Sequence, residues 1–447
     1  MISEKPWMHY TPMNKIGFIS LGCSKNLVDT EIMIGLCKEK GYTIVNDPEE
    51  AEAIIINTCG FIDDAKEEAI STILDAAKLK EDGKLKKLIV TGCLAQRYKE
   101  AVLEELPEVD LIVGVDEFPR IAELLAHETG ACVTTNTAPY PEDAPRTLST
   151  PSFMAYLKIA EGCDNHCTYC AIPSIRGPFR SRRMEDVIKE AKGLYESGVR
   201  ELSVIAQDTT RYGVDLYGQS ALPKLLKALA EIGFPWIRLF YTYADSITDE
   251  LLEVMASHKN ILPYLDIPIQ HIDNTVLRRM GRKDTAEGIK NLISKIRTKL
   301  PEAVLRTSII VGFPGETEDA FSSLCEFVKT GAFDRMGVFK FSPEDGTPAA
   351  KLPDQIDEDT KMERHEKLYT IAKSVSEEAL RKKIGTEQEV LCEGFSDMFY
   401  VGRTKGDGAE IDGKVYFASE EDIAPGSFVK VRILATEEYD IIGEVTK

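Results

Sequence analysis

The sequence predicts a multidomain α/β protein with two parallel α/β parts and a small antiparallel β-barrel at its C-terminal end. Three observations support this fold class. Short apolar runs alternate with amphipathic helical segments in two separate series, a proline-rich stretch divides the two series, and the last sixty-odd residues hold only strand-like runs with Gly and Asp turns. At 447 residues the chain exceeds what one hydrophobic core can organise, so about three domains are expected.

The first series predicts a parallel sheet covered by helices in residues 14–130. Its strand candidates are KIGFIS, AIIIN, KLIVT and LIVG, and each precedes a segment with helical periodicity. Residues 1–13 lack the apolar segment and cleavage site of a secretory signal, and they are expected to be a loose tail. Residues 131–152 contain four prolines and are expected to be a linker.

The second series covers residues 153–384 and predicts a partial (β/α)6 barrel of the TIM type. Its six strand candidates are AYLKIA, ELSVIA, WIRLFYT, YLDIPI, LRTSIIV and GVFKF, and charged amphipathic stretches separate them. A long charged helix is expected over about residues 357–383. Residues 385–447 hold five short strand-like runs and predict the small antiparallel barrel.

The composition predicts a cytoplasmic protein with reduced cysteines and no membrane contact. The chain is 43% apolar and 29% charged, and no apolar run approaches the ~20 residues that cross a bilayer. Because cytosolic thiols are kept reduced, ten cysteines favour metal binding over disulfides. The formal net charge of −20 disfavours a partner held through its phosphates and favours a basic partner.

Three cysteines in the stretch EGCDNHCTYC stand in a CxxxCxxC spacing without a fourth cysteine nearby: Cys163, Cys167 and Cys170. One alternative is a structural zinc site with His166 as the fourth ligand. Side chains of adjacent residues, such as His166 and Cys167, rarely bind the same tetrahedral ion. No distant CxxC or HxxxH partner is evident in the sequence. A cubane iron–sulfur cluster held by three thiolates keeps one iron open. The spacing therefore favours a 4Fe–4S cluster with an open coordination position.

Three further cysteines each follow the end of a predicted parallel strand: Cys23 in SLGCSKN, Cys59 in NTCGFI and Cys93 in TGCLAQRY, 36 and 34 residues apart. Ligands gather at the carboxyl ends of strands in open α/β sheets, so loops from neighbouring strands can bring three thiols together. The alternative is that these cysteines are small buried hydrophobes, which explains one such placement better than three. The remaining four lack this positional logic and are expected to be packing residues: Cys37, Cys132, Cys325 and Cys392.

The CxxxCxxC loop after the first strand of a partial barrel resembles the radical S-adenosylmethionine (SAM) enzymes. The resemblance implies that the amino and carboxylate groups of SAM chelate the open iron. It also implies that an electron from the cluster splits the sulfonium to give a 5′-deoxyadenosyl radical. Tyr169, between the second and third cysteines, resembles the aromatic residue that packs near the cluster and adenine in this family. A role as a loop anchor is the alternative for Tyr169.

Further SAM contacts are expected from the same resemblance. AQDTTRYG resembles the family stretch that faces the methionyl part of SAM, so Gln207 and Asp208 are candidate contacts. GFPGET begins at Gly312, where the absence of a side chain permits close backbone approach, although a plain turn explains this motif nearly as well. Thr307 and Phe339, on later strands, are additional candidates.

The complete set of domains resembles the methylthiotransferases, which combine an N-terminal cluster domain, a radical SAM domain and a C-terminal TRAM domain. The resemblance covers nearly the whole chain. It implies that Cys23, Cys59 and Cys93 hold a second 4Fe–4S cluster, whose open iron carries a sulfide that a first SAM methylates. A second SAM yields the radical that takes hydrogen from a C–H bond, and the methylthio group joins that carbon. An electron donor such as a flavodoxin is implied, while the sulfur donor stays unidentified.

The two branches of this family differ in substrate. One branch modifies an adenosine in tRNA, and the other modifies the β-carbon of an aspartate in ribosomal protein number twelve of the small subunit. The stretches SLGCSKNLVDTE and EGCDNHCTYCAIPSIRGPFRSR resemble the ribosomal-protein branch. The tRNA branch tends to show a Gln-Met-Asn version of the first motif. A non-catalytic iron–sulfur module that binds RNA or the ribosome is the competing function, but a structural site normally closes its coordination sphere.

The charge of the C-terminal part bears independently on the substrate. Residues 384–447 contain 14 Asp plus Glu and 6 Lys plus Arg, a net charge of −8. Such a TRAM domain should repel tRNA and attract a basic ribosomal protein, unless the charge serves only solubility. The run IRGPFRSRR at residues 175–183 concentrates basic side chains, as a solvated charged run or as a substrate contact.

Overall fold

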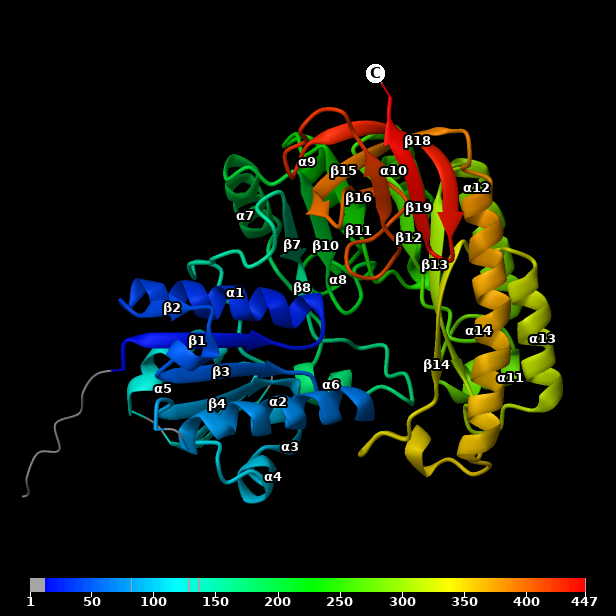
Figure 1. Ribbon diagram of the computed structural model, residues 1–447. Coiled ribbons are helices and arrows are strands. Elements are labelled where there is room, and N and C mark those ends of the chain that lie inside the picture. The colour runs from blue at the N-terminus through cyan, green and yellow to red at the C-terminus, as the bar shows by residue number, and fades with distance from the viewer. Residues whose placement is uncertain (1–12, 82, 128, 136, 447) are drawn as a thin grey trace, which may run out of the picture. The chain divides into compact units, whose positions relative to one another are not determined.

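The computed structural model describes residues 13–81, 83–127, 129–135 and 137–446, and the chain forms two compact units (Figure 1). Unit 1 comprises Met1–Ser149 together with Ser174–Gly177, and unit 2 comprises Thr150–Pro173 together with Pro178–Lys447. A short stretch from the middle of the sequence therefore belongs to the N-terminal unit. The expected tail lies outside the described residues except for Met13, which is buried.

Unit 1 is built on a parallel six-stranded sheet with the order β2-β1-β3-β4-β5-β6. The four predicted strands are confirmed as β1 (Lys15–Ser20), β3 (Ala53–Thr58), β4 (Lys87–Gly92) and β5 (Leu111–Val113). β3 and β4 are buried along their whole length, as central strands of a sheet covered on both faces should be. The helices are α1 (Ser24–Glu39), α2 (Asp63–Glu81), α3 (Cys93–Tyr98), α4 (Glu100–Glu105) and α5 (Ile121–His127), with the 3₁₀ turns η1 (Pro48–Glu50) and η2 (Phe118–Arg120).

The sequence pattern does not predict the two edge strands of this sheet. β2 (Thr43–Val45) pairs with β1, and β6 (Gly130–Cys132) pairs with β5. Three residues are too few to show the alternation that identifies a strand. β6 also extends into the residues expected to be linker. Later in that linker, Arg146 forms an ion pair of 2.6 Å with the buried carboxylate of Glu31, so this part of the linker packs on α1.

Unit 2 contains a second parallel six-stranded sheet, with the order β14-β13-β12-β11-β10-β7. Each strand lies beside the one that precedes it in the sequence, as in a TIM-type barrel, and β7 and β14 form the two edges. The predicted partial barrel is therefore confirmed. Its strands are β7 (Met154–Lys158), β10 (Glu201–Ile205), β11 (Trp236–Leu239), β12 (Ile261–Asp266), β13 (Val304–Val311) and β14 (Arg335–Lys340).

Several helices of unit 2 begin at a capping side chain. Thr248, Thr285, Thr317 and Asp357 each accept a hydrogen bond from the backbone N–H three residues later. Such a cap contributes about 1 kcal/mol and determines where the helix begins.

The longer helices of unit 2 are α7 (Met184–Glu196), α9 (Leu222–Ala230), α10 (Asp249–Ser257), α12 (Ala286–Lys299), α13 (Glu318–Lys329) and α14 (Glu358–Arg381). The short elements are β8 (Ala160–Glu161), β9 (Arg180–Ser181), α8 (Val214–Tyr217), η3 (Ala244–Ser246), α11 (Asn274–Arg279) and η4 (Ala349–Lys351), together with α6 (Ile172–Arg176), whose residues from Ser174 onward belong to unit 1.

The C-terminal strands close into a five-stranded barrel with the order β15-β16-β17-β19-β18. Four of its pairings are antiparallel, while β17 and β19 pair in parallel. The small core of this barrel contains the buried side chains of Val390, Val415, Phe417 and Val431. The strands are β15 (Glu387–Ser396), β16 (Phe399–Thr404), β17 (Val415–Ala418), β18 (Phe428–Glu437) and β19 (Asp440–Val445).

A buried ion network joins this small barrel to the strands of the partial barrel within unit 2. Glu201 on β10 accepts hydrogen bonds from Nε of Arg238 on β11 at 2.9 Å and from Nη2 of Arg403 on β16 at 2.6 Å. All three side chains are excluded from solvent. Burial alone raises the pKa of Glu201, but the charges of Arg403 and Arg238 outweigh burial and bring the value to about 2.

The Glu201 network should make the stability of unit 2 depend on pH under acidic conditions. The pKa of Glu201 lies below its ordinary value of 4.5, so the ionised carboxylate stabilises the fold above pH 4.5, and this contribution is lost as the pH falls toward about 2. Glu201→Gln should cost about 3 kcal/mol or more at neutral pH, because it leaves two buried arginines without their carboxylate. Denaturant unfolding at several pH values measures both effects.

The control for this experiment is Glu326→Gln, which removes an exposed ion pair with Lys329 on α13. It should change the free energy of unfolding by less than about 1 kcal/mol. A Glu201→Gln penalty that is equally large at pH 3 and pH 7 would contradict the assignment.

Candidate functional site

In unit 1 the loops that carry Cys23, Cys59 and Cys93 lie at the carboxyl ends of three parallel strands of the sheet. These cysteines follow β1, β3 and β4, which are neighbours in the sheet and run in parallel. Cys23 is the N-cap residue of α1, Cys59 directly follows β3, and Cys93 is the first residue of α3. The strand order on which the sequence argument for this triad depends is therefore confirmed.

Glycines beside these cysteines let the three loops approach one another. A side chain on Gly22 would place its Cβ 2.7 Å from Cβ of Cys59, and a Cβ on Gly60 would lie 2.7 Å from Cα of Leu94, the residue after Cys93. Both distances are too short for a real Cβ, so only glycine allows this packing. The thiols also influence one another electrostatically, since Cys23 raises the pKa of both Cys59 and Cys93 beyond the effect of burial.

The surroundings of these three thiols lower the pKa of one of them and raise the pKa of the other two. Burial alone raises the pKa of Cys23, but the charges of Lys25 and Arg176 and backbone N–H groups at the start of α1 outweigh it, so the pKa is lowered. Burial raises the pKa of Cys59 and brings that of Cys93 to about 11, while Arg176 acts in the opposite direction on both. A bound metal centre supplies the positive charge that deprotonates such buried thiols.

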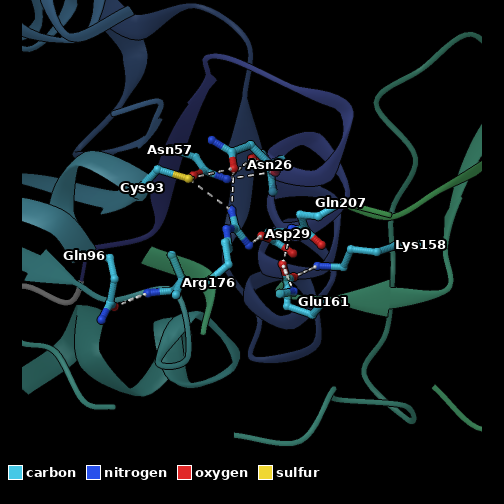
Figure 2. Close-up of polar contacts among 12 residues, drawn as sticks. Asn26, Asp29, Asn57, Cys93, Gln96, Lys158, Glu161, Arg176 and Gln207 are labelled. Carbon is cyan, nitrogen blue, oxygen red and sulfur yellow. Dashed lines mark hydrogen bonds and ion pairs between the residues drawn. The ribbon is translucent and has the colours of Figure 1, made fainter. Parts of the chain in front are cut away.

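Arg176 is buried in unit 1, close to Cys93 (Figure 2). Its Nη1 lies 2.7 Å from Oδ2 of Asp29, and its Nη2 donates to Oδ1 of Asn26 at 2.5 Å. The same Nη2 lies 3.6 Å from Sγ of Cys93. Arg182, in unit 2, is also buried and pairs with Glu190 at 2.6 Å.

The prediction that the basic run is a solvated surface or a substrate contact is therefore wrong for Arg176 and Arg182, whose guanidinium groups form internal ion pairs. The sequence analysis did not identify Arg176 as a neighbour of the triad Cys23, Cys59 and Cys93. Its partners on α1 lie about 150 positions earlier in the chain, and no local spacing rule connects residues that far apart.

In unit 2 the CxxxCxxC loop lies between β8 and α6. Cys163 and Cys167 are buried, and Cys170 is half-buried. Burial raises the pKa of Cys163 to about 11 and also raises that of Cys170. The hydroxyl of Tyr243 lies 2.7 Å from Sγ of Cys167, where it can donate a hydrogen bond to a thiolate. Sequence reasoning did not single out Tyr243, because it comes from the loop that follows a different strand, β11.

A zinc site with His166 gains no support from the structure. His166 is exposed and has a φ of 51°, and the described part of the chain contains no group of three or more His, Cys, Asp or Glu side chains arranged to hold a single metal ion. A 4Fe–4S cluster makes a different demand, since each thiolate binds its own iron.

Tyr169 is held in a way that suits the loop-anchor alternative. Its ring meets Phe313 edge-on at a centroid distance of 6.5 Å, within an apolar cluster that includes Met280 and Phe341. The backbone beside it is also fixed, since the N–H of Thr168 donates to the carbonyl of Met280 at 2.9 Å.

Gln207 combines a fixed position with an open hydrogen-bonding capacity (Figure 2). Its Nε2 donates to Oε1 of Glu161 at 2.5 Å, and Lys158 pairs with the other oxygen of Glu161 at 2.8 Å. The buried Oε1 of Gln207 accepts no hydrogen bond from the residues that the structure describes. Leaving such an acceptor unsatisfied costs about 1–3 kcal/mol, which a ligand ammonium or hydroxyl would recover. SAM carries both groups, so this residue fits a SAM contact.

The other predicted SAM contacts are placed differently. Asp208 is buried and accepts hydrogen bonds from Nδ2 of Asn165 at 2.7 Å and from the N–H of Thr210 at 3.0 Å, so it braces the cysteine loop. The hydroxyl of Thr307 on β13 donates to the carbonyl of Ile267 at 2.8 Å, a hydrogen bond that links β13 to the residue after β12.

The two remaining candidates differ in exposure. The N–H of Gly312 donates to Oε2 of the buried Glu316 at 2.7 Å, which shapes the GFPGET turn. Phe339, near the end of β14, is 47% exposed. Neither observation tests a contact with SAM, and both positions stay predictions.

All ten cysteines are free thiols. Of the four expected to be packing residues, Cys37, Cys325 and Cys392 are buried, while Cys132 on β6 is half-buried with its thiol 3.8 Å from Oε2 of Glu117. Burial raises the pKa of Cys37 to about 12, which makes it a poor ligand or nucleophile.

Family models match three successive parts of the chain. The model described as "Uncharacterized protein family UPF0004" matches residues 15–114, the radical SAM superfamily matches 157–328, and the TRAM domain matches 384–446. Membership of the radical SAM superfamily implies SAM and a 4Fe–4S cluster as cofactors. Among the described helices, none has the length and apolar character needed to cross a membrane.

Known proteins resemble the chain over nearly its whole length. "Ribosomal protein uS12 methylthiotransferase RimO" from Clostridioides difficile (strain 630) is 54% identical over 439 residues, which cover 97% of this chain and 99% of that protein. Its namesake from Caldicellulosiruptor saccharolyticus is 49% identical over 441 residues, with coverage of 97% and 100%. The structure of the radical SAM methyltransferase TsrM from Kitasatospora setae matches with a TM-score of 0.56 at 12% identity, covers 76% of this chain and 77% of that chain, and supports the fold alone. The chain belongs to the RimO family of radical SAM methylthiotransferases.

Proposed function

We propose that this enzyme adds a methylthio group to the β-carbon of an aspartate in ribosomal protein uS12, with SAM and two 4Fe–4S clusters as cofactors. The observation that carries the proposal is the pair of cysteine triads, one in each unit, in a chain 54% identical to a protein named for this reaction. Each triad offers three thiolates and leaves one coordination position of a cubane open.

The proposal assigns one cluster to each unit. Cys163, Cys167 and Cys170 would hold the cluster that binds SAM in unit 2, and Cys23, Cys59 and Cys93 would hold the second cluster in unit 1. When bound, these groups supply the radical that removes hydrogen from the substrate and the sulfur that replaces it. The protein must hold the thiolates, orient SAM and exclude water.

Several contacts within unit 2 support this proposal. The hydroxyl of Tyr243 lies 2.7 Å from Sγ of Cys167 and would donate a hydrogen bond to a thiolate there, which offsets part of the cost of a buried anion. The guanidinium of Arg282 lies over the ring of Tyr243 at 4.1 Å and adds positive charge nearby. Gln207, held by Glu161, would accept a hydrogen bond from the ammonium group of SAM. Tyr169, Gly312, Thr307 and Phe339 remain proposed contacts of the family type, with Asp208 as a brace of the cysteine loop.

Two broader features belong to the same proposal. Ten free thiols suit a reducing compartment, so we place the enzyme in the cytoplasm. Reduction of the unit 2 cluster requires a partner protein of low potential, for which a flavodoxin is proposed from the family resemblance.

The central test compares two substrates. The anaerobically reconstituted enzyme is incubated with SAM, a reductant and either purified uS12 or total tRNA, and the products are analysed by mass spectrometry. We expect the mass gain of one methylthio group on an aspartate of uS12 and none on tRNA. A gain on tRNA alone would show that the enzyme has the substrate of the other branch.

Substitutions in the two triads should separate two activities. Cys167→Ala should abolish both the formation of 5′-deoxyadenosine and the methylthio product, because the loss of one thiolate removes the cluster or displaces its open iron. Cys59→Ala should leave 5′-deoxyadenosine formation measurable and abolish the product. Chromatography of the nucleoside and mass spectrometry of uS12 measure the two activities.

The control for this pair is Cys325→Ala, which changes a buried cysteine outside both triads and should keep both activities. Each variant must first show a cooperative melt, because metal binding and folding are linked. A well-folded Cys59→Ala enzyme that methylthiolates at the normal rate would overturn the role of unit 1. A fully loaded parent that forms no 5′-deoxyadenosine would favour a non-catalytic module.

The TRAM barrel offers two acidic ends rather than one acidic face. β17 pairs with β19 in parallel, with Ala418 opposite Glu444 and Val415 opposite Ile441. The loop that follows Ala418 and the turn that precedes Ile441 therefore lie at opposite ends of the barrel. The first end holds Glu420, Glu421 and Asp422, and the second holds Glu437, Glu438 and Asp440.

The first of these ends is the better candidate for a protein contact. The tip of the β15–β16 hairpin lies beside it, because Tyr400 pairs with Phe417 and its hydroxyl lies 3.4 Å from Oδ1 of Asp422. The hairpin exposes Phe395 by 64% and Met398 by 82%. Apolar anchors beside acidic side chains suit a basic protein better than the phosphates of tRNA.

Neutralising the first end should weaken the association with uS12. The double variant Glu420→Gln and Glu421→Gln should lose about 1 kcal/mol of binding free energy at low salt, roughly fivefold in Kd, and its salt dependence should flatten. Titration calorimetry at two salt concentrations measures both effects. The matched control, Glu437→Gln and Glu438→Gln at the opposite end, should change binding less. Equal losses from both pairs would mean that net charge alone attracts the partner.

A further inference from the structure

We propose that Arg176 is a positioning residue for the cluster of unit 1: held by Asp29 and Asn26, it donates a hydrogen bond to the Cys93 thiolate and makes the cluster easier to reduce. This inference rests on the proposed function, because it takes Cys23, Cys59 and Cys93 as the ligands of that cluster. It adds a fourth side chain, from a part of the sequence far from all three cysteines, to the surroundings of the site.

The position of Arg176 is fixed from two sides. Nη1 lies 2.7 Å from Oδ2 of Asp29, and Nη2 lies 2.5 Å from Oδ1 of Asn26. Asn26 is itself fixed, since its Nδ2 donates to the carbonyls of Thr58 at 3.0 Å and Leu21 at 3.2 Å. These acceptors belong to the segments that precede Cys59 and Cys23. The guanidinium is therefore held by the same loops that present the thiols.

The contacts at Cys93 suit a thiolate better than a thiol. As a thiol, Cys93 can donate to Oδ1 of Asn26 at 3.7 Å. Loss of the proton removes that donor, whereas Nη2 of Arg176, 3.6 Å from Sγ, remains as a donor to the anion. Hydrogen bonds to anionic acceptors are about twice as strong as those between neutral groups.

A buried cation should also change the affinity of the cluster for an electron. A cubane held by three thiolates is anionic, and reduction adds another negative charge. Hydrogen bonds to the sulfurs and the local charge are among the features that determine the reduction potential of such a cluster. Arg176 is 2% exposed, so water screens its charge weakly. Asp29, also buried, offsets part of this charge and keeps the guanidinium oriented.

A second buried ion pair on the same helix provides a matched control. Glu31 on α1 pairs with Arg146 at 2.6 Å and also accepts a hydrogen bond from the N–H of Ser149 at 2.8 Å. Removal of Arg146 therefore breaks a buried pair in unit 1 without removing a donor to Cys93. The two arginines allow damage to the fold to be separated from an effect on the cluster.

The experiment uses the full chain with Cys163, Cys167 and Cys170 replaced by Ala, so that only the cluster of unit 1 contributes to the spectrum. This parent and three variants, Arg176→Gln, Arg176→Lys and Arg146→Gln, are reconstituted with iron and sulfide. Redox titrations followed by electron paramagnetic resonance give midpoint potentials, and the rate of iron loss to a chelator gives cluster retention. A thermal melt of each apo protein reports on the fold.

Arg176→Gln should lower the affinity of the cluster for its electron at least tenfold, a shift of 59 mV toward more negative potential for one electron, and should speed iron loss. Arg146→Gln should leave the potential at the parent value even if its melting temperature falls. Arg176→Lys keeps the charge but has one nitrogen in place of the two that contact Asp29, Asn26 and Sγ, so it cannot keep the positions of all these contacts and its potential should lie between those of the parent and the Gln variant. Its iron loss should be faster than that of the parent.

A loaded Arg176→Gln protein with the potential of the parent would overturn the inference, as would an equal shift in Arg146→Gln. If Arg176→Gln does not fold, the Lys variant decides: parent-like potential together with parent-like iron loss would overturn the inference. A parent that binds no cluster at all would show that Cys23, Cys59 and Cys93 do not hold one, and it would thereby overturn the proposed function itself. If the parent binds the cluster and the variants have the same potential as the parent, only this inference fails and the proposed function is unaffected.

Discussion

The two proposed clusters require six buried or half-buried cysteines to carry negative charge. Burial raises the pKa of four of them: Cys59, Cys93, Cys163 and Cys170. A thiol that ligates iron must be a thiolate, so the surroundings must supply the compensating charge and hydrogen bonds. Much of the local structure around both triads serves this requirement.

The two units meet the requirement with different means. Unit 1 uses the start of α1, where backbone N–H groups and Lys25 lower the pKa of Cys23, and it adds the buried guanidinium of Arg176. Unit 2 uses side chains from other loops of the partial barrel, with Tyr243 against Cys167 and Arg282 over the ring of Tyr243. An open parallel sheet places helix N-termini beside its ligands, whereas the closely spaced triad of unit 2 lies on one loop and depends on its neighbours.

The C-terminal barrel is fixed to the partial barrel by buried charge as well. Glu201 lies between Arg238 and Arg403, and Arg335 on β14 pairs with the buried Asp407 at 2.6 Å. Such networks are geometrically demanding, because a buried charge left without its partner is costly. They hold the small barrel in one orientation within unit 2, so its exposed hairpin and acidic loop face a defined direction relative to the strands of that unit.

The sequence by itself determined the three-part architecture and the placement of both cysteine triads. These features follow from local patterns: apolar runs of strand length, helical periodicity, and cysteines directly after strands such as β3 and β4. The match is close for β1, which covers Lys15–Ser20, the stretch KIGFIS. The short edge strands β2 and β6 are too brief to leave such a pattern.

Only the tertiary structure decided which polar side chains face inward. Arg176 meets Asp29 across 147 positions of sequence, and Arg403 meets Glu201 across 202. Local sequence records which residues are near in the chain and not which are near in space, so it described Arg176 only as a member of a basic run. The hydroxyl of Thr307 is likewise engaged by a neighbouring segment of the sheet, at Ile267. Pairing between distant segments determines whether a charged residue is solvated or buried, and that pairing exists only once the chain has folded.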